Sequence, residues 1–292
     1  MSKRTKTAIL ITSFLAFFVL SYFIISYAYG YQFNFANLKW VETGGLFTKA
    51  NLDSVEVYIN GHLKGKTSFF SNTFIEKNLL PGKYDLKFSK EGFPKISKTI
   101  EIKSGEANQL THLYLPDQGE INDFIESSEP VKENPSYFIN KKDGLLYRKT
   151  EDEKIEKISS ESVYIKNFEL KVLEKEIYLA SKDLKAPGVF LLSSDGNWEN
   201  IHSSSANDLV LSPDNKKLAV VGQNEISILW LKNENEPPYF EKSHKEVILK
   251  TSEKIERVLW FKTSWHLIYL TESGKTNFVE VDPSGGRNDL II

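Results

Sequence analysis

The sequence predicts an all-β ectodomain, a small β-sandwich plus a partial or small β-propeller, behind one N-terminal transmembrane helix. Three observations predict this fold class. One uncharged, apolar run occupies residues 8–29. Short runs rich in Val, Ile, Leu, Tyr and Phe, separated by Asn-Gly, Pro-Gly and Asp-Gly turns, fill most of the remainder. In the C-terminal half, similar strand patterns recur at roughly 40 to 45 residues.

The composition excludes two classes of protein. With 292 residues, a formal net charge of −2 and 40% hydrophobic residues, the chain is neither a strongly basic nucleic-acid binder nor a disordered polymer. Three of the 37 basic side chains and none of the 39 acidic ones lie in the first 30 residues, so the rest is mildly acidic. The chain has no cysteine, which excludes disulfides and a lipid-modified cysteine anchor.

Residues 8–30 are predicted to form a transmembrane helix after a cytoplasmic stub of residues 1–7. A helix rises about 1.5 Å per residue, so a run of this length spans roughly 33 Å, close to the thickness of a hydrocarbon core. Lys3, Arg4 and Lys6 precede the run, and the next basic residue is Lys39. The positive-inside rule therefore predicts a cytoplasmic N-terminus and an extracytoplasmic C-terminus.

A cleaved signal peptide is the alternative to this membrane anchor. Ser26-Tyr27-Ala28 resembles a small-x-small cleavage site, and the basic start fits a signal peptide as well. The apolar run is longer than the 7 to 15 residues or so of a secretory signal, and bulky aromatic residues continue past the site. These features favour a retained anchor.

The soluble part is predicted to have four segments. Residues 31–40 are membrane-proximal, 41–116 form the β-sandwich, 117–135 form an acidic linker, and 136–292 form propeller-like β repeats of three to four blades. The linker is inferred from its six acidic residues, two prolines and weak periodicity, which are typical of a solvated spacer.

Six or seven short strands are predicted in residues 41–116. Residues 55–59 alternate, and Asn60-Gly61 supplies the positive φ angles of a tight hairpin turn. Leu80-Pro81-Gly82-Lys83 is a second turn, before a strand at residues 84–88. Such a chain buries one face of each strand in a sandwich.

The order and spacing of these turns resemble a PEGA domain. The resemblance lies in V-x-V-Y-I-N-G-x-x-x-G-K-T at residues 55–67, L-x-P-G-x-Y-x-L-x-F at residues 79–88 and K-E-G-F at residues 90–93. It implies a small extracytoplasmic β-sandwich of a prokaryotic surface protein. The Pro-Glu-Gly-Ala turn for which the family is named is absent, because Leu52-Asp53-Ser54 occupies its place.

An internal repeat is predicted in residues 136–292. Its copies begin near Leu170, Leu211 and Trp260, each with a second strand pair, and a weaker copy begins near Tyr137. The Ser-Pro-Asp-x-Lys-x-Leu-Ala segment from Ser212 resembles blades of TolB-like and WD40-like propellers. Three to four blades lie at or below the minimum of a closed ring. A four-bladed ring, an arc completed by a second copy in a homo-oligomer, a truncated array and a non-propeller sandwich all remain open.

The sequence contains no recognisable catalytic or metal-binding motif. Gly61 to Thr67 has three residues, not four, between its first glycine and Gly-Lys-Thr, and a strand follows in place of a helix, so a phosphate-binding loop is disfavoured. No histidine has zinc-site spacing. We therefore expect no catalytic residue, cofactor or metal. Trp198 and Trp265, near turns, are predicted ligand contacts.

A binding or scaffold role in the cell envelope is the function that these features favour, with a surface protein or wall glycan as partner and the membrane contacted through residues 8–30. An extracytoplasmic propeller-type hydrolase or lyase acting on envelope polymers is the alternative. Its acids would converge in a channel that sequence spacing does not reveal. A sensor that signals through residues 1–7 is disfavoured by the shortness of that stub.

Overall fold

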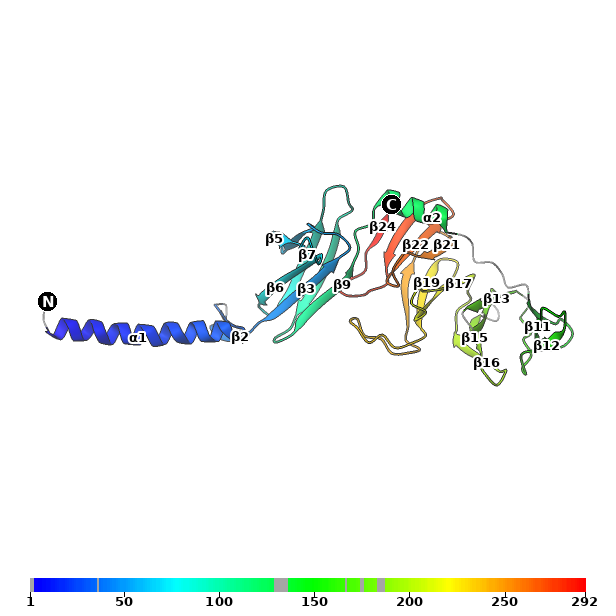
Figure 1. The fold of residues 1–292 in the computed structure, drawn as a ribbon, viewed down its shortest axis with the longest axis horizontal. Helices are drawn as coiled ribbons and strands as arrows, with labels where there is room; N and C mark the ends of the chain where they lie inside the picture. Colours follow the sequence, from blue (N-terminus) through cyan, green and yellow to red (C-terminus); the bar gives the residue numbers. More distant parts are fainter. Residues whose placement is uncertain (1–2, 36, 129–135, 166, 174–175, 183–186) are drawn as a thin grey trace. The chain divides into compact units, whose positions relative to one another are not determined.

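A computed structural model describes residues 3–35, 37–128, 136–165, 167–173, 176–182 and 187–292. The chain forms two compact units, Met1–Leu115 with Ser284–Gly286, and Pro116–Pro283 with Arg287–Ile292. Strands dominate both units (Figure 1), so the predicted fold class is confirmed.

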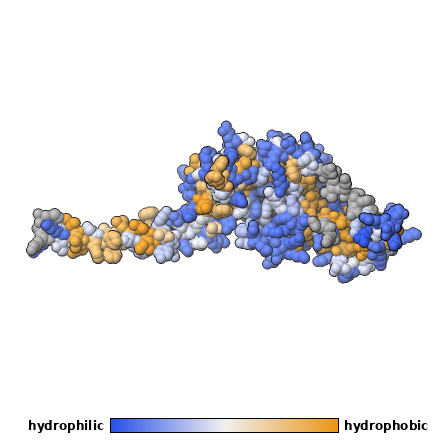
Figure 2. All heavy atoms as spheres, in the orientation of Figure 1, coloured by the Kyte–Doolittle hydropathy of each residue, from blue (hydrophilic) through white to orange (hydrophobic). Residues whose placement is uncertain are grey.

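Helix α1 (Lys3–Ala28) is the N-terminal apolar helix. It is long and apolar enough to cross a membrane, although a signal sequence at the N-terminus would have the same properties. Its large side chains from Ile9 to Tyr27 are exposed, and they form the hydrophobic surface of the helix in Figure 2. An apolar helix whose side chains all face outward is suited to contact lipid.

The hairpin of β1 (Tyr31–Asn34) and β2 (Lys39–Glu42) follows α1. Its antiparallel register places Phe33 opposite Trp40. The predicted membrane-proximal segment therefore contains two paired strands.

Residues 44–113, all of which are described, form a sandwich of two sheets with seven strands. One sheet has the order β6-β3-β9 and the other β5-β4-β7-β8. The first and last strands, β3 and β9, pair in parallel. The bounds are β3 Gly44–Ala50, β4 Glu56–Ile59, β5 His62–Lys66, β6 Thr73–Leu79, β7 Gly82–Ser89, β8 Ile96–Ile102 and β9 Ala107–Leu113.

The sandwich follows from alternation and turn chemistry. Along β8, Ile96, Ile100 and Ile102 are buried in the core, and the residues between successive buried positions are exposed. Asn60 and Gly61 have φ angles of 50° and 79°, as a tight two-residue hairpin requires, so the predicted β4–β5 turn is confirmed.

The described residues of the second unit form four successive antiparallel sheets. The first has three strands, and the next three have four strands each in simple chain order, which is the organisation of propeller blades. The bounds are β10 Tyr137–Ile139, β11 Leu146–Lys149, β12 Ile155–Lys157, β13 Phe168–Leu173, β14 Glu176–Ser181, β15 Gly188–Leu192, β16 Trp198–His202, β17 Asp208–Leu211, β18 Lys217–Val221, β19 Glu225–Trp230, β20 Lys245–Lys250, β21 Ile255–Trp260, β22 His266–Thr271, β23 Thr276–Glu280 and β24 Asp289–Ile291.

Strand β18 shows why these sheets stack face to face. All five of its residues are buried. Leu218 and Val220 join the core shared with β13–β16, whereas Ala219 and Val221 join the core shared with β21–β24. Because successive side chains point to opposite faces, a strand between two sheets must be apolar throughout. This explains the continuous apolar run that marks the repeat.

The predicted acidic linker contains a helix that the sequence pattern did not predict. Helix α2 (Gln118–Ser127) has Asp117 as its N-cap residue, and the Asp117 side chain accepts a hydrogen bond from the Glu120 backbone N–H. Ile121 is fully buried. The prediction of a solvated spacer is therefore wrong for residues 118–127. Residues 129–135 of the predicted linker lie outside the described part of the chain.

Helix α2 packs against the last sheet of its unit. The Phe124 and Phe261 ring centroids lie 5.1 Å apart, Lys262 pairs with Glu120, and Arg257 donates to the Ser128 carbonyl. Phe261 in turn contacts Phe278, on the β23 face opposite the core shared with β17–β20. Helix α2 therefore covers the face of the sheet β21–β24 on which a further blade would have to pack.

Candidate functional site

A cavity lies where the first strands of the three four-stranded sheets meet. Strand β17 lies beside both β13 and β21. The cavity has a volume of about 390 Å³ and combines charged and aliphatic side chains. We call it the axial pocket. It is lined by Glu169, Lys171, Asn207, Asp208, Val210, Val221, Ile255, Glu256, Arg257, Val258 and Leu259.

The charges in the axial pocket are organised around Lys171. Its Nζ atom lies 3.3 Å from Glu169 Oε1 and also hydrogen-bonds Asp208 Oδ1. Lys182 Nζ lies 2.8 Å from the second Glu169 oxygen, and the Leu209 backbone N–H donates to Asp208. The Lys171 and Glu169 side chains are only 13% and 17% exposed, so solvent screens this pair less than a surface pair.

The protonation of Lys171 follows from these contacts. Burial disfavours its charged form, but the hydrogen bond to Asp208 and the charge of Glu169 outweigh that effect and raise the pKa of Lys171 above its ordinary value. Lys171 therefore remains an ammonium ion at neutral pH. Glu169 and Asp208 are both paired with this cation.

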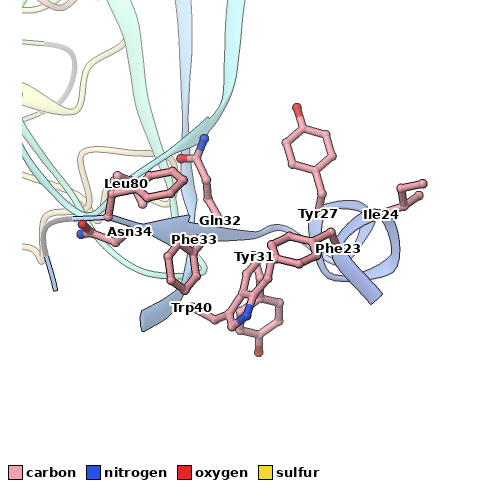
Figure 3. A pocket seen from close by; sticks show the side chains of 10 residues that line it. Phe23, Ile24, Tyr27, Tyr31, Gln32, Phe33, Asn34, Trp40 and Leu80 are labelled. Carbon is pink, nitrogen blue, oxygen red and sulfur yellow. The ribbon is translucent and has the colours of Figure 1, made fainter. Parts of the chain in front are cut away.

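A second feature, at the end of α1, is an aromatic collar formed by Tyr22, Phe23, Phe33 and Trp40. The Trp40 ring centroid lies 5.1 Å from that of Phe23, 5.6 Å from that of Tyr22 and 5.5 Å from that of Phe33. Figure 3 shows Phe23 of the helix beside Trp40 and Phe33 of the hairpin. The hairpin thus packs its aromatic face onto the last turns of α1.

The two predicted tryptophan contacts occupy different environments. Trp265 is 8% exposed and packs in the core between β17–β20 and β21–β24, so the expectation that its position near a turn would expose it is wrong. Trp198 begins β16 and is half-buried. Neither residue lines the axial pocket. A ligand contact at Trp198 stays a prediction.

A buried charge cluster beside Trp265 was not predicted. Lys217 is fully buried, and its Nζ atom lies 3.1 Å from Asp214 Oδ2 and 3.2 Å from Glu234 Oε2. Lys216 binds the other Glu234 oxygen at 2.9 Å. The sequence signal is the Ser-Pro-Asp turn from Ser212, but the turn alone does not show which lysine points inward.

Comparison with known families supports the assignment of the sandwich. Residues 43–115 match the family model described as PEGA domain. This confirms the resemblance drawn from the turn motifs, and PEGA is an extracellular type of domain. The match covers only the sandwich and leaves the second unit unassigned. No curated protein matches the sequence significantly.

Solved structures with some likeness to a large part of the chain include three proteins of different kinds. A luciferin-regenerating enzyme has 12% identity and a TM-score of 0.35, covering 73% of this chain and 70% of the other. A eukaryotic initiation factor has 13% identity and a TM-score of 0.34, covering 72% and 52%. A quinonprotein alcohol dehydrogenase-like protein from Bacteroides thetaiotaomicron has 10% identity and a TM-score of 0.25, covering 84% and 69%. Likeness at this level assigns no activity to the chain.

Proposed function

We propose that the chain is a single-pass membrane protein of a prokaryotic cell envelope, with a cytoplasmic N-terminus, and that its two β units form an extracytoplasmic binding or scaffold module. Helix α1, the PEGA match and the basic residues before the helix support this proposal. The partner is an envelope protein or a wall glycan.

The packing of Trp40 on α1 is the observation that carries the proposal. Cleavage after Ala28 would remove Tyr22 and Phe23, two of the rings that Trp40 contacts. The half-buried Trp40 would then lose two aromatic pairs, worth about 0.5 to 1.5 kcal/mol each, and would expose more of its ring to water. The folded hairpin therefore favours a retained helix over a cleaved signal peptide.

The axial pocket is the proposed place of partner contact. Its ion-paired side chains offer hydrogen bonds to a polar ligand, and Val210 and Val258 offer an apolar wall. A cavity of a few hundred Å³ with a few polar groups in an apolar surround is typical of a ligand site. A sugar unit or a peptide side chain matches this mixture of surfaces.

Capture of envelope components by the purified full chain in detergent tests the proposal. The wild-type protein should retain a specific envelope protein or wall polysaccharide. Glu256→Lys reverses an exposed charge at the axial pocket and should lower retention, because a ligand fitted to that carboxylate would meet a cation. Glu236→Lys makes the same change at an exposed position outside the pocket and should leave retention unchanged. Retention of neither component by the wild-type chain would contradict the proposal.

One observation keeps a hydrolase or lyase as a second candidate. Three carboxylates, of Glu169, Asp208 and Glu256, line the axial pocket. If they act on an envelope polymer, the wild-type chain should release reducing or unsaturated chain ends from purified wall polysaccharide. Asp208→Asn and Glu256→Gln should abolish that release. Unchanged polymer after incubation with the wild-type chain would remove this candidate.

A further inference from the structure

We propose that the cavity between the end of α1 and the β1–β2 hairpin binds the acyl chain of a bilayer lipid. We call this space the collar cavity. The inference rests on the proposed function in one respect, namely that α1 remains attached. It adds a ligand class and a binding site to what an anchor alone provides.

The collar cavity has the size and the lining of a site for an apolar chain. Its volume is about 700 Å³, within the range of roughly 300 to 1,000 Å³ that is usual for small-molecule sites. Aromatic side chains from both elements line it, and Leu80 of the sandwich adds an aliphatic edge (Figure 3). The residues that carry this argument are Phe23, Ile24, Tyr27, Phe33, Trp40 and Leu80.

The uncharged lining of the cavity indicates a lipid tail as ligand and not an ion. None of the ten residues that line the cavity, all of them described, carries a charge. An apolar ligand therefore meets no desolvated ion, whereas a charged group would lose its hydration without a partner. Binding should accordingly depend on the acyl chain and not on the charge of the headgroup.

The cavity lies where an acyl chain of the bilayer is available. Phe23, Ile24 and Tyr27 belong to the last turns of the membrane-spanning helix, where tyrosine and tryptophan side chains favour the headgroup layer. A lipid that enters here can keep its ester groups at that layer and lay its chain against Trp40. Gln32, which also lines the cavity, offers an amide that can hydrogen-bond such an ester.

The hairpin is what distinguishes this cavity from a bare helix surface. Trp40 contacts Tyr22 and Phe23 across the gap between the elements, and its opposite neighbour Phe33 lies on the same hairpin. A chain lodged there contacts rings on two sides and therefore buries more apolar area than a chain that lies against a bare helix. One lipid should therefore stay bound when the surrounding bilayer lipids have been removed by mild detergent.

Native mass spectrometry of the full chain, extracted in mild detergent with a defined phospholipid, tests the proposal. The wild-type protein should retain one phospholipid, equally for zwitterionic and anionic headgroups. Trp40→Ala should lower the retained fraction by roughly tenfold or more, because most of one aromatic contact is lost. Leu20→Ala, which shortens an exposed side chain of α1 outside the cavity, should leave retention unchanged.

Trp40 fluorescence gives a second measurement that does not depend on detergent. The difference between wild type and Trp40→Phe in nanodiscs isolates its emission from the four other tryptophans. Bromine near the ester end of the acyl chain should quench that emission more than bromine at the chain terminus.

The outcomes separate this inference from the proposed function. An intact mass that lacks α1 would overturn both. A full-length mass without bound lipid, together with Trp40 emission insensitive to brominated chains, would overturn only the lipid site. Equal loss of lipid in Trp40→Ala and Leu20→Ala would also overturn it, because the lipid would then bind the helix surface generally.

Discussion

The Lys217 ammonium group lies 4.1 Å from the centroid of the Trp265 ring, in the interior of the second unit. The same nitrogen hydrogen-bonds Asp214 and Glu234. A cation over an indole face, with two carboxylates beside it, is a satisfied buried charge. Trp265 is thus part of a structural charge cluster, which explains why a tryptophan next to a turn is buried.

Removal of this charge should destabilise the protein strongly. Lys217→Met would leave Asp214 and the nearly buried Glu234 without their shared cation, at a cost of about 3 kcal/mol in the free energy of unfolding. Lys216→Met removes a partly exposed lysine from the same Glu234 and should cost about 1 kcal/mol or less. Urea unfolding of the full chain, followed by tryptophan fluorescence, measures both. Equal losses would contradict a special role for Lys217.

The same cluster predicts a loss of stability in acid. Burial acts to raise the pKa of Glu234, but hydrogen bonds from Lys216 and Lys217 outweigh it and hold that pKa below its ordinary 4.5. A depressed folded-state pKa stabilises the protein fully above about 4.5, and this contribution is lost as the pH falls through the folded-state pKa. The urea midpoint of the wild type should therefore fall steeply below about pH 4.5. Glu234→Gln should flatten this dependence, and an unchanged slope would show that Glu234 does not cause it.

Two adjacent glycines of β3 should differ in how much stability an alanine costs. A Cβ on Gly44 would lie 2.4 Å from the Lys103 carbonyl oxygen and 2.8 Å from that of Glu106. Both oxygens belong to the backbone, so they cannot easily move away to relieve the clash. Gly44→Ala should thus cost about 1 to 3 kcal/mol or more. At Gly45 the nearest atom is 3.4 Å away, so Gly45→Ala should cost little. Thermal unfolding of the two variants compares them, and matching midpoints would refute the predicted crowding.

Removal of the Phe124 side chain from α2 should destabilise the sheet β21–β24 against which this helix packs. Phe124→Ala removes the half-buried ring that meets Phe261 and should cost about 1 to 3 kcal/mol. It should also promote self-association, because it uncovers apolar surface. Asp123→Ala, at an exposed neighbouring position, should do neither. Light scattering and unfolding midpoints measure the two effects. A monomeric and fully stable Phe124→Ala variant would show that α2 does not protect this face.

The local sequence pattern predicted the strands well because the signals for each strand lie within a few residues of one another. The alternation at residues 55–59 and the Asn60-Gly61 turn specify a hairpin without distant contacts. In the second unit, the apolar run at residues 218–220 reflects burial on both faces, so it predicted a stacked sheet.

Helix α2 was missed although its signals are local. Asp117 and Glu120 have the spacing of a capping box, and Ile121, Phe124 and Ile125 have helical spacing on one face. The high acidic content of residues 117–135 is equally typical of a solvated spacer, so composition did not distinguish the two. Sequence pattern did not predict the axial pocket, because Lys171 and Asp208 come from different sheets and meet only after these stack.

Accessibility of introduced cysteines tests the central claim, an anchored chain with its β units outside, most directly. The wild-type chain has no cysteine, so single cysteines report without background. In spheroplasts with an intact membrane, a membrane-impermeant maleimide should label Ser252→Cys, an exposed position of the second unit, and the labelled chain should sediment with the membrane at full length. Ser2→Cys should be labelled only after the membrane is opened. Labelling of Ser2→Cys in sealed spheroplasts with protection of Ser252→Cys, or release of a shortened labelled chain, would contradict the account.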